Sequence, residues 1–123
     1  MAITLNTTLR NARGQAIVTE AGATAKLTVY TAAYAAVLYS SNCAAVLGTV
    51  SGGVLTFGAV GNATATGAGT AAIARLFKVD GTTMVIEGLT VGTSGTNIII
   101  TNATIAVNDV ITTSSATITE GNP

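Results

Sequence analysis

Short strand-like segments separated by turn signals recur about every ten residues along most of this chain, and this spacing constrains the fold more than any other feature. The segment Ala23–Thr31 is an example, because apolar and polar residues alternate along it. Leu27 and Val29 lie on one side, and polar residues lie on the other. Short strands at this spacing are typical of sandwiches and barrels. We therefore expect an all-β fold, an antiparallel β-sandwich or a jelly-roll-like barrel, that spans residues 23–123.

One hairpin stands out in this pattern. The dipeptide Asp80-Gly81 is a tight-turn signal between two strand-like segments, Ala71–Val79 and Thr82–Val91. Another turn and strand are predicted over Ser51–Val60, and a last strand over Val110–Glu120. The alanine-rich segment Thr31–Gly48 is compatible with a short helix or with strand, loop and strand, and the sequence leaves both open.

The first 22 residues predict a helix that is added to the β-rich body within a single domain. Its apolar face is expected to comprise residues at three- and four-residue steps, namely Leu5, Leu9, Ala12, Ala16 and Ile17. Thr4 or Asn6 could cap its start, and Gly22 could close its end. Gly14 weakens its interior by roughly 1 kcal/mol, so we expect the helix to depend on docking.

The segment Ile98–Val107 is unusually apolar. We expect one strand with Ile99, Ile105 and Val107 on one face and Ile98, Ile100 and Ala106 on the other. Apolar residues on both faces are expected where one face packs on the core and the other meets a second sheet or subunit.

Charge is scarce in this chain. Charged residues make up 8% of it, against roughly 25% in ordinary soluble domains, and five basic residues balance five acidic ones. No net field would attract a nucleic acid, so we expect no direct nucleic-acid partner. A surface with so few charges is expected to be buried against other protein chains.

The residue inventory excludes several kinds of catalytic site. The chain has no histidine, which removes Ser-His-Asp and Cys-His catalysis, and its five carboxylates are widely separated. The motif TGAGTAA, residues 66–72, imitates a dinucleotide-binding loop, but a hairpin follows it instead of a helix. Cys43 is the one cysteine and is expected to be a buried apolar residue. We therefore expect no enzyme activity, no cofactor and no metal.

The expected location is the cytoplasm of the producing cell, where assembly would take place. The N-terminus lacks the basic start and apolar run of a signal peptide. The uncharged segment Thr31–Gly48 is interrupted by Ser40-Ser41-Asn42 and is too rich in alanine for a membrane span, so no membrane contact is expected.

Seven residues are candidates for contacts with other chains. Arg10 and Arg13 lie close together on the predicted helix, and a solvated face is the alternative interpretation for them. Aromatic side chains could be core or interface anchors, and the apolar strand could meet a subunit. The full set is Arg10, Arg13, Tyr34, Tyr39, Ile98, Ile100 and Thr104.

Most of the chain resembles small structural proteins encoded in the morphogenesis regions of tailed bacteriophages and prophages. The stretches that carry the resemblance are residues 1–31, SGGVLTFGAV, RLFKVDGTTMVIEGLTVGTSGTNIIITN and VITTSSATITEGN, and the region 32–48 departs from it. The resemblance implies a capsid decoration or cement protein on the outer surface of the virion, bound to the major capsid protein and to itself as a homotrimer. It carries over no functional residue.

Three other functions stay open at this point. A neck or tail protein falls under the same resemblance. The threonine- and alanine-rich strands would also suit a subunit of a surface fibre. A small enzyme or ligand-binding barrel would be a monomer with an ordered pocket lined by polar groups.

Overall fold

The computed structural model describes residues 6–119, and the first element in it is the predicted helix. Helix α1 spans Thr7–Ala21, and the Asn6 side chain accepts a hydrogen bond from the Leu9 amide at 2.8 Å. Gly22 ends the helix with a positive φ of 69° and donates its N–H to the Val18 carbonyl. The predicted helix and two of its proposed caps, Asn6 and Gly22, are therefore confirmed, while Leu5 and Thr4 lie outside the described residues.

Among the described residues of the predicted apolar face of α1, only Ile17 is confirmed, since it is partly buried and packs against the core. Leu9, Ala12 and Ala16 are exposed, and the buried positions are Gly14, Val18 and Ala21. The reason is close approach to the sheet, because a Cβ at Gly14 would lie 2.9 Å from a methyl group of Val50. The docked face is therefore the one where the small residue Gly14 allows the helix to approach the sheet. The periodicity of hydrophobic residues carries no information about this.

The rest of the chain consists of short strands, as expected. The strand bounds are β1 Lys26–Tyr30, β2 Val37–Asn42, β3 Gly48–Ser51, β4 Val54–Phe57, β5 Ala63–Thr64, β6 Gly69–Thr70, β7 Ile73–Phe77, β8 Met84–Gly92, β9 Ile98–Ile100, β10 Thr104–Ile105, β11 Val110–Ile111 and β12 Thr113–Thr119. The segment that the sequence left open forms a 3-10 turn, η1 Ala32–Tyr34, followed by β2.

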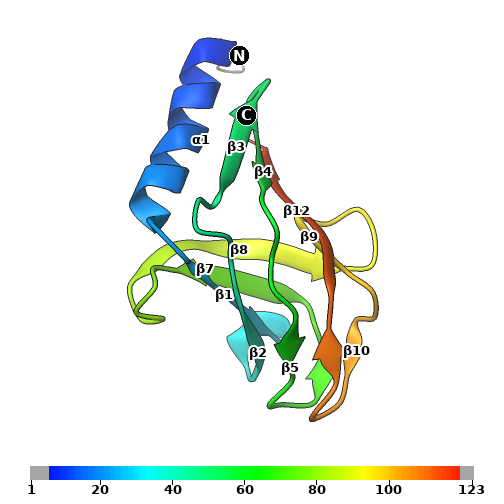
Figure 1. Cartoon of the computed structure of the whole chain (residues 1–123). Helices are drawn as coiled ribbons and strands as arrows, with labels where there is room; N and C mark the ends of the chain where they lie inside the picture. Colours follow the sequence, from blue (N-terminus) through cyan, green and yellow to red (C-terminus); the bar gives the residue numbers. More distant parts are fainter. Residues whose placement is uncertain (1–5, 120–123) are drawn as a thin grey trace.

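Eight of these strands form one sheet in the order β2-β1-β7-β8-β9-β12-β4-β3. The sheet curls strongly into a half-barrel, with β3, β4 and β12 facing β1, β7 and β8 across the interior (Figure 1). Two small sheets, β10 with β6 and β11 with β5, join the connections at one end. The expected mostly β fold with an N-terminal helix is confirmed.

The sheet is mixed, which differs from the expected antiparallel arrangement. Strands β8 and β9 run parallel, with Val91 opposite Ile98, while the other pairs among the described strands are antiparallel. Asn97, between these strands, secures the connection. Its side-chain oxygen accepts hydrogen bonds from the Thr90 amide and hydroxyl at 3.0 Å, and its amide group donates to the Thr117 carbonyl at 3.3 Å.

The hairpin predicted around Asp80-Gly81 is confirmed. Strands β7 and β8 pair antiparallel, with Phe77 opposite Met84. An Asp80 oxygen accepts hydrogen bonds at 2.8 Å from the amides of Thr82 and Thr83, and Gly81 has a φ of 73°. These hydrogen bonds to its charged form lower the pKa of Asp80 to about 2, with the Thr83 hydroxyl making the largest contribution.

The single strand expected over Ile98–Val107 was wrong. The segment splits into β9 and β10, which belong to different sheets and are separated by residues 101–103. Ile98, Ile100 and Ile105 are buried, at 0%, 1% and 2% exposure, whereas Val107 is 51% exposed. A turn within the segment thus allows isoleucines of both predicted faces to enter the interior of this chain.

The core lies inside the curl and beneath α1. One continuous cluster contains Val18 and Ala21 of the helix together with residues from both walls of the sheet, including Leu27, Val29, Leu55, Leu76 and Ile98. Leu27 and Val29 share the buried side of β1, as the alternation predicted. Cys43 also belongs to this cluster and is 5% exposed, which confirms its predicted burial.

Candidate interaction surfaces

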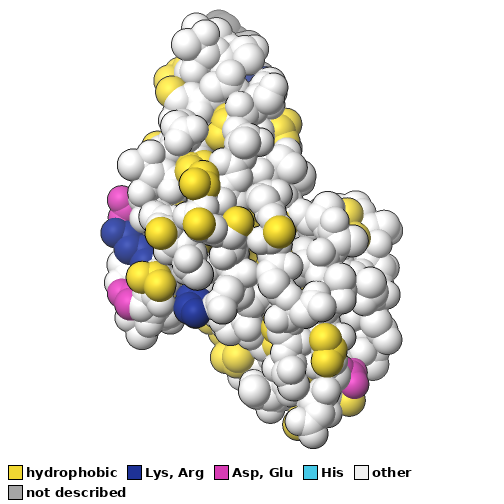
Figure 2. Space-filling model, in the orientation of Figure 1, with side chains coloured by type: hydrophobic (Ala, Val, Ile, Leu, Met, Phe, Trp, Pro, Cys, Tyr) yellow, Lys and Arg dark blue, Asp and Glu magenta, His cyan; other side chains and the backbone are white. Residues whose placement is uncertain are grey.

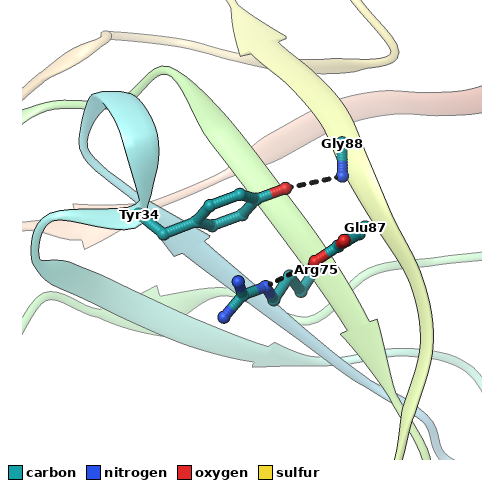
Figure 3. A network of polar contacts seen from close by, with 4 residues as sticks. All are labelled: Tyr34, Arg75, Glu87 and Gly88. Atoms are coloured by element: carbon teal, nitrogen blue, oxygen red, sulfur yellow. Dashed lines mark hydrogen bonds and ion pairs between the residues drawn. The ribbon is translucent and has the colours of Figure 1, made fainter.

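Tyr34 and Arg75 form the centre of a polar cluster on the outer side of the sheet. The Arg75 guanidinium carbon lies 3.8 Å from the centroid of the Tyr34 ring and 5.2 Å from that of Tyr30. The two tyrosine rings meet edge to face with centroids 5.2 Å apart. Figure 3 shows the Tyr34 ring extended above the guanidinium, which leaves its flat face in contact with the cation. We call Tyr30, Tyr34, Arg75 and Glu87 the Tyr34–Arg75 cluster.

Two hydrogen bonds connect this cluster to β8. Arg75 Nε donates to Glu87 Oε2 at 3.2 Å, and the Gly88 amide donates to the Tyr34 hydroxyl at 2.8 Å (Figure 3). Desolvation lowers the pKa of Arg75, but contacts with Tyr30 and Glu87 outweigh it and raise the pKa overall. Arg75 therefore carries a fixed positive charge that is stacked on an aromatic ring.

The backbone around the cluster is irregular at two places. Ala33 and Tyr34 have positive φ angles of 57° and 58°, which cost non-glycine residues energy. In β8 the pairing with β7 shifts between Ala74 and Leu76, and Gly88 has a φ of 82°. The Tyr34–Gly88 hydrogen bond joins these two irregular places, and the Tyr34 ring between them lies over Arg75.

Several of the remaining charges are also held in local contacts. Lys78 Nζ pairs with Glu20 Oε1 at 3.0 Å, which connects the end of α1 to the β7–β8 turn. Lys26 Nζ donates to the Asn42 side chain, and the Ala106 amide donates to the Asp109 carboxylate at 2.9 Å. The Lys78–Glu20 ion pair reduces the charge that the molecule presents at a distance, whereas the neutral partners of Lys26 and Asp109 only hold those side chains in place.

The wall formed by β3, β4 and β12 presents an uncharged outer side. Thr49 pairs with Thr56, and Thr56 pairs with Thr117, so three threonines stand in one row across three strands. Thr49 and Thr56 are exposed, and Thr117 is partly exposed. We call Thr49, Ser51, Thr56, Thr117 and Thr119 the hydroxyl face. Figure 2 shows little charge over this wall, whereas charged side chains gather at the margin near the β7–β8 turn.

Three of the predicted contact residues lie in the core, which corrects their assignment to a surface. Tyr39, Ile98 and Ile100 are at most 1% exposed, because the curl encloses them within this chain. Tyr34 instead reaches the surface in the cluster described above, and Thr104 is exposed on β10.

Arg10 and Arg13 lie on α1, as predicted, but at different depths. Arg10 is partly buried, and its guanidinium occupies the space above Gly53, where an added Cβ would lie 2.6 Å from it. Arg13 is exposed, and both residues make further interactions within the protein.

Sequence reasoning missed Tyr30, Arg75 and Glu87. The predicted turn at Asp80-Gly81 carried a usable signal for two of them, since a hairpin centred there brings residues 75 and 87 near one another on adjacent strands. The approach of η1 to this hairpin depends on tertiary structure and had no local signal.

Residues 6–119 contain no candidate for another kind of site. No pocket is found there, and no group of three or more Cys, Asp or Glu side chains is placed to hold a metal ion. In the same part of the chain, no helix has the length and hydropathy needed to cross a bilayer.

Comparisons with known proteins give no relative of this chain: no family model, no curated protein and no solved structure matches it.

Proposed function

We propose that this chain is a non-enzymatic structural subunit of a tailed-bacteriophage virion, a capsid decoration or cement protein that binds the major capsid protein on the outside of the head. The observation that carries the proposal is the distribution of charge. The hydroxyl face of β3, β4 and β12 contains no charged residue, and the charge next to it is Arg10 of α1, over Gly53 in the β3–β4 turn. Arg75, Glu87, Lys78 and Asp80 belong to the opposite wall and its turn.

Such an arrangement suits a subunit with one side against protein and another toward solvent. A contact made by hydroxyl groups and the backbone avoids the desolvation of charges, which costs several kcal/mol per ion. The charged wall would then maintain solubility of the assembled particle. In this proposal the uncharged side of the subunit contacts the shell, and the Tyr34–Arg75 cluster faces the solvent outside the particle.

Many copies on one shell would multiply a modest contact free energy per subunit. In this proposal the chain is made and assembled in the host cytoplasm and contacts both the major capsid protein and further copies of itself. The antiparallel sandwich or jelly-roll-like barrel expected for residues 23–123 stays a prediction, and strands from a neighbour could extend the open curl of the sheet.

Electron cryo-microscopy of the virion produced by the strain that encodes this chain tests the proposal directly. We expect density for the half-barrel on the outer surface of the head, with β3, β4 and β12 toward the shell. Particles that lack the protein by mass spectrometry, or that carry it only in the tail, would contradict the proposal.

Binding of variants to the shell locates the contact. Thr56→Glu should weaken co-sedimentation of the purified protein with shells at least tenfold, because it places an unpaired charge in the contact. Ser40→Glu is the matched control, since Ser40 is an exposed strand residue on the other wall. If both variants bind the shells equally well, the hydroxyl face is not part of the contact.

A further inference from the structure

The sheet has two edges, and only one of them is covered by the chain itself. At the β2 edge, the Leu38 carbonyl accepts hydrogen bonds from the amides of Thr66 and Gly67 at 2.9 and 3.2 Å, and the Asn42 carbonyl accepts one from Gly61 at 2.8 Å. The loop that follows β4 therefore occupies much of the place that a next strand would take beside β2.

The β3 edge differs in its hydrogen bonding. Gly52 and Gly53 form the turn of the β3–β4 hairpin with φ angles of 59° and 77°, as in a two-residue type I′ turn. In that geometry Ser51 and Thr49 bond to β4, and the Leu47 carbonyl continues the series by accepting from Gly58 at 2.9 Å. Gly48 and Val50 consequently direct their N–H and C=O groups outward, and no backbone hydrogen bond from residues 6–119 reaches them there.

Nothing in β3 discourages pairing with another strand. Proteins protect an exposed edge with charged residues, proline or a bulge, and the sequence Gly-Thr-Val-Ser over residues 48–51 has none of these and pairs with β4 without a register shift. Two unprotected edges of this kind complement each other when they run antiparallel.

We propose that β3 pairs antiparallel with β3 of a second copy of this chain across a two-fold axis beside Thr49. Gly48 of each copy would exchange hydrogen bonds with Val50 of the other, and the two Thr49 side chains would face each other. The threonine row Thr49, Thr56 and Thr117 would then continue into its symmetric copy and double the width of the hydroxyl face.

Helix α1 leaves room for this contact. It packs on the side of the hairpin that Val50 faces, and contacts both β3 and β4. With α1 centred over the β3–β4 hairpin, the two copies of α1 in the dimer would be two strand spacings apart, about 10 Å. This is an ordinary distance between packed helices.

This inference deepens the proposed function by naming a partner for the same uncharged wall. Its test uses the purified chain alone, so its failure would leave the tests of shell binding unaffected. A two-fold contact also differs from the homotrimer that the resemblance implies.

Sedimentation equilibrium of the purified protein over a wide concentration range is the first measurement. We expect a concentration-dependent dimer. Thr49→Lys should abolish the dimer, because it places two ammonium groups directly opposite each other. Thr56→Lys is the matched control in the same row, and it should leave the dimer intact. Its two lysines, one in each copy, would be about 14 Å apart across the two-fold axis, beyond the screening length of about 8 Å. Circular dichroism and the melting temperature should show both variants folded.

Crosslinking checks the register. Thr49→Cys should form a disulfide-linked dimer under mild oxidation, since its Cβ atoms would be about 5 Å apart, while Thr56→Cys should not. The native Cys43 is 5% exposed and does not compete. A monomer at every concentration, a trimer, a dimer that survives Thr49→Lys, or a dimer without the Thr49→Cys crosslink would each overturn the proposal.

Discussion

Individual charged side chains in this protein each make a local contact that holds part of the fold. With ten charged residues in the sequence, individual groups act locally: Asp80 closes a turn, Arg75 stacks on Tyr34, and Lys78 holds the end of α1 through Glu20. The Asp80 turn could be predicted, because its signal lies within two adjacent residues. The Arg75 cluster could not, because Tyr34 reaches it from a separate part of the chain.

Asp80 should make the β7–β8 turn sensitive to acid. Its pKa is lowered from 3.8 to about 2, so its contribution to folding is present above pH 3.8 and is lost as the pH falls toward 2. An NMR titration of the Asp80 carboxyl carbon should show this shifted pKa. The stability difference between wild type and Asp80→Asn should shrink as the pH falls from 3.8 toward 2. A difference that stays constant with pH would contradict stabilisation of the turn by the Asp80 carboxylate.

At the scale of elements, contacts between small residues decide how the helix docks. The hydrophobic pattern placed Leu9, Ala12 and Ala16 inward, whereas α1 docks through Gly14, Val18 and Ala21 against β3 and β4. Periodicity predicts that a helix is amphipathic, but the choice of face depends on the shape of what it meets. At this contact Val50 fills the space that a side chain at residue 14 would need.

Gly14→Ala should therefore have opposite effects in two backgrounds. In the wild type the added Cβ would lie 2.9 Å from a Val50 methyl group, and the cost of this clash should exceed the gain in helix propensity, so the protein loses stability. In Val50→Ala the space is open, and Gly14→Ala should stabilise by about 0.5–1 kcal/mol. Urea unfolding of the four proteins gives the coupling. Additive effects would argue against close docking at this point.

At the scale of the whole molecule, the curl of the sheet brings β2 opposite β12. The Tyr39 hydroxyl of β2 lies near Thr113 of β12, although these strands are far apart in the sheet order. Within the described residues, the hydroxyl oxygens of Tyr39, Ser41 and Thr113 are buried without a hydrogen bond of normal geometry. Burial raises the pKa of Tyr39 to about 12, and Thr113 lowers it by less.

Tyr39→Phe should stabilise the protein by about 1 kcal/mol, because it removes a buried hydroxyl that makes no hydrogen bond of normal geometry. Tyr34→Phe is the control with the opposite sign, since its hydroxyl accepts a hydrogen bond from Gly88 at 2.8 Å. Thermal unfolding measures both.

The alkaline limb gives a second check on Tyr39. Because its folded pKa is raised, wild-type stability should be retained below pH 10 and lost as the pH rises toward 12, and Tyr39→Phe should lack that loss. Destabilisation by both substitutions would mean that the Tyr39 hydroxyl is satisfied within the core.

The sequence by itself determined the features that depend on neighbouring residues. The helix with its caps at Asn6 and Gly22, the alternation of β1 and the hairpin at Asp80-Gly81 all follow from capping, period and turn chemistry within a few positions. The low charge also follows from composition alone, and it is the main support for a role in assembly.

Tertiary structure alone decided which surfaces remain for contacts. It enclosed Tyr39, Ile98 and Ile100, divided Ile98–Val107 between two sheets, and ran β9 parallel to β8. It also covered the β2 edge with a loop and left the outward groups of β3 without a backbone partner among the described residues. The physical reason is that burial and strand pairing join residues distant in sequence, and the closure of the curl selects among alternatives of similar local energy.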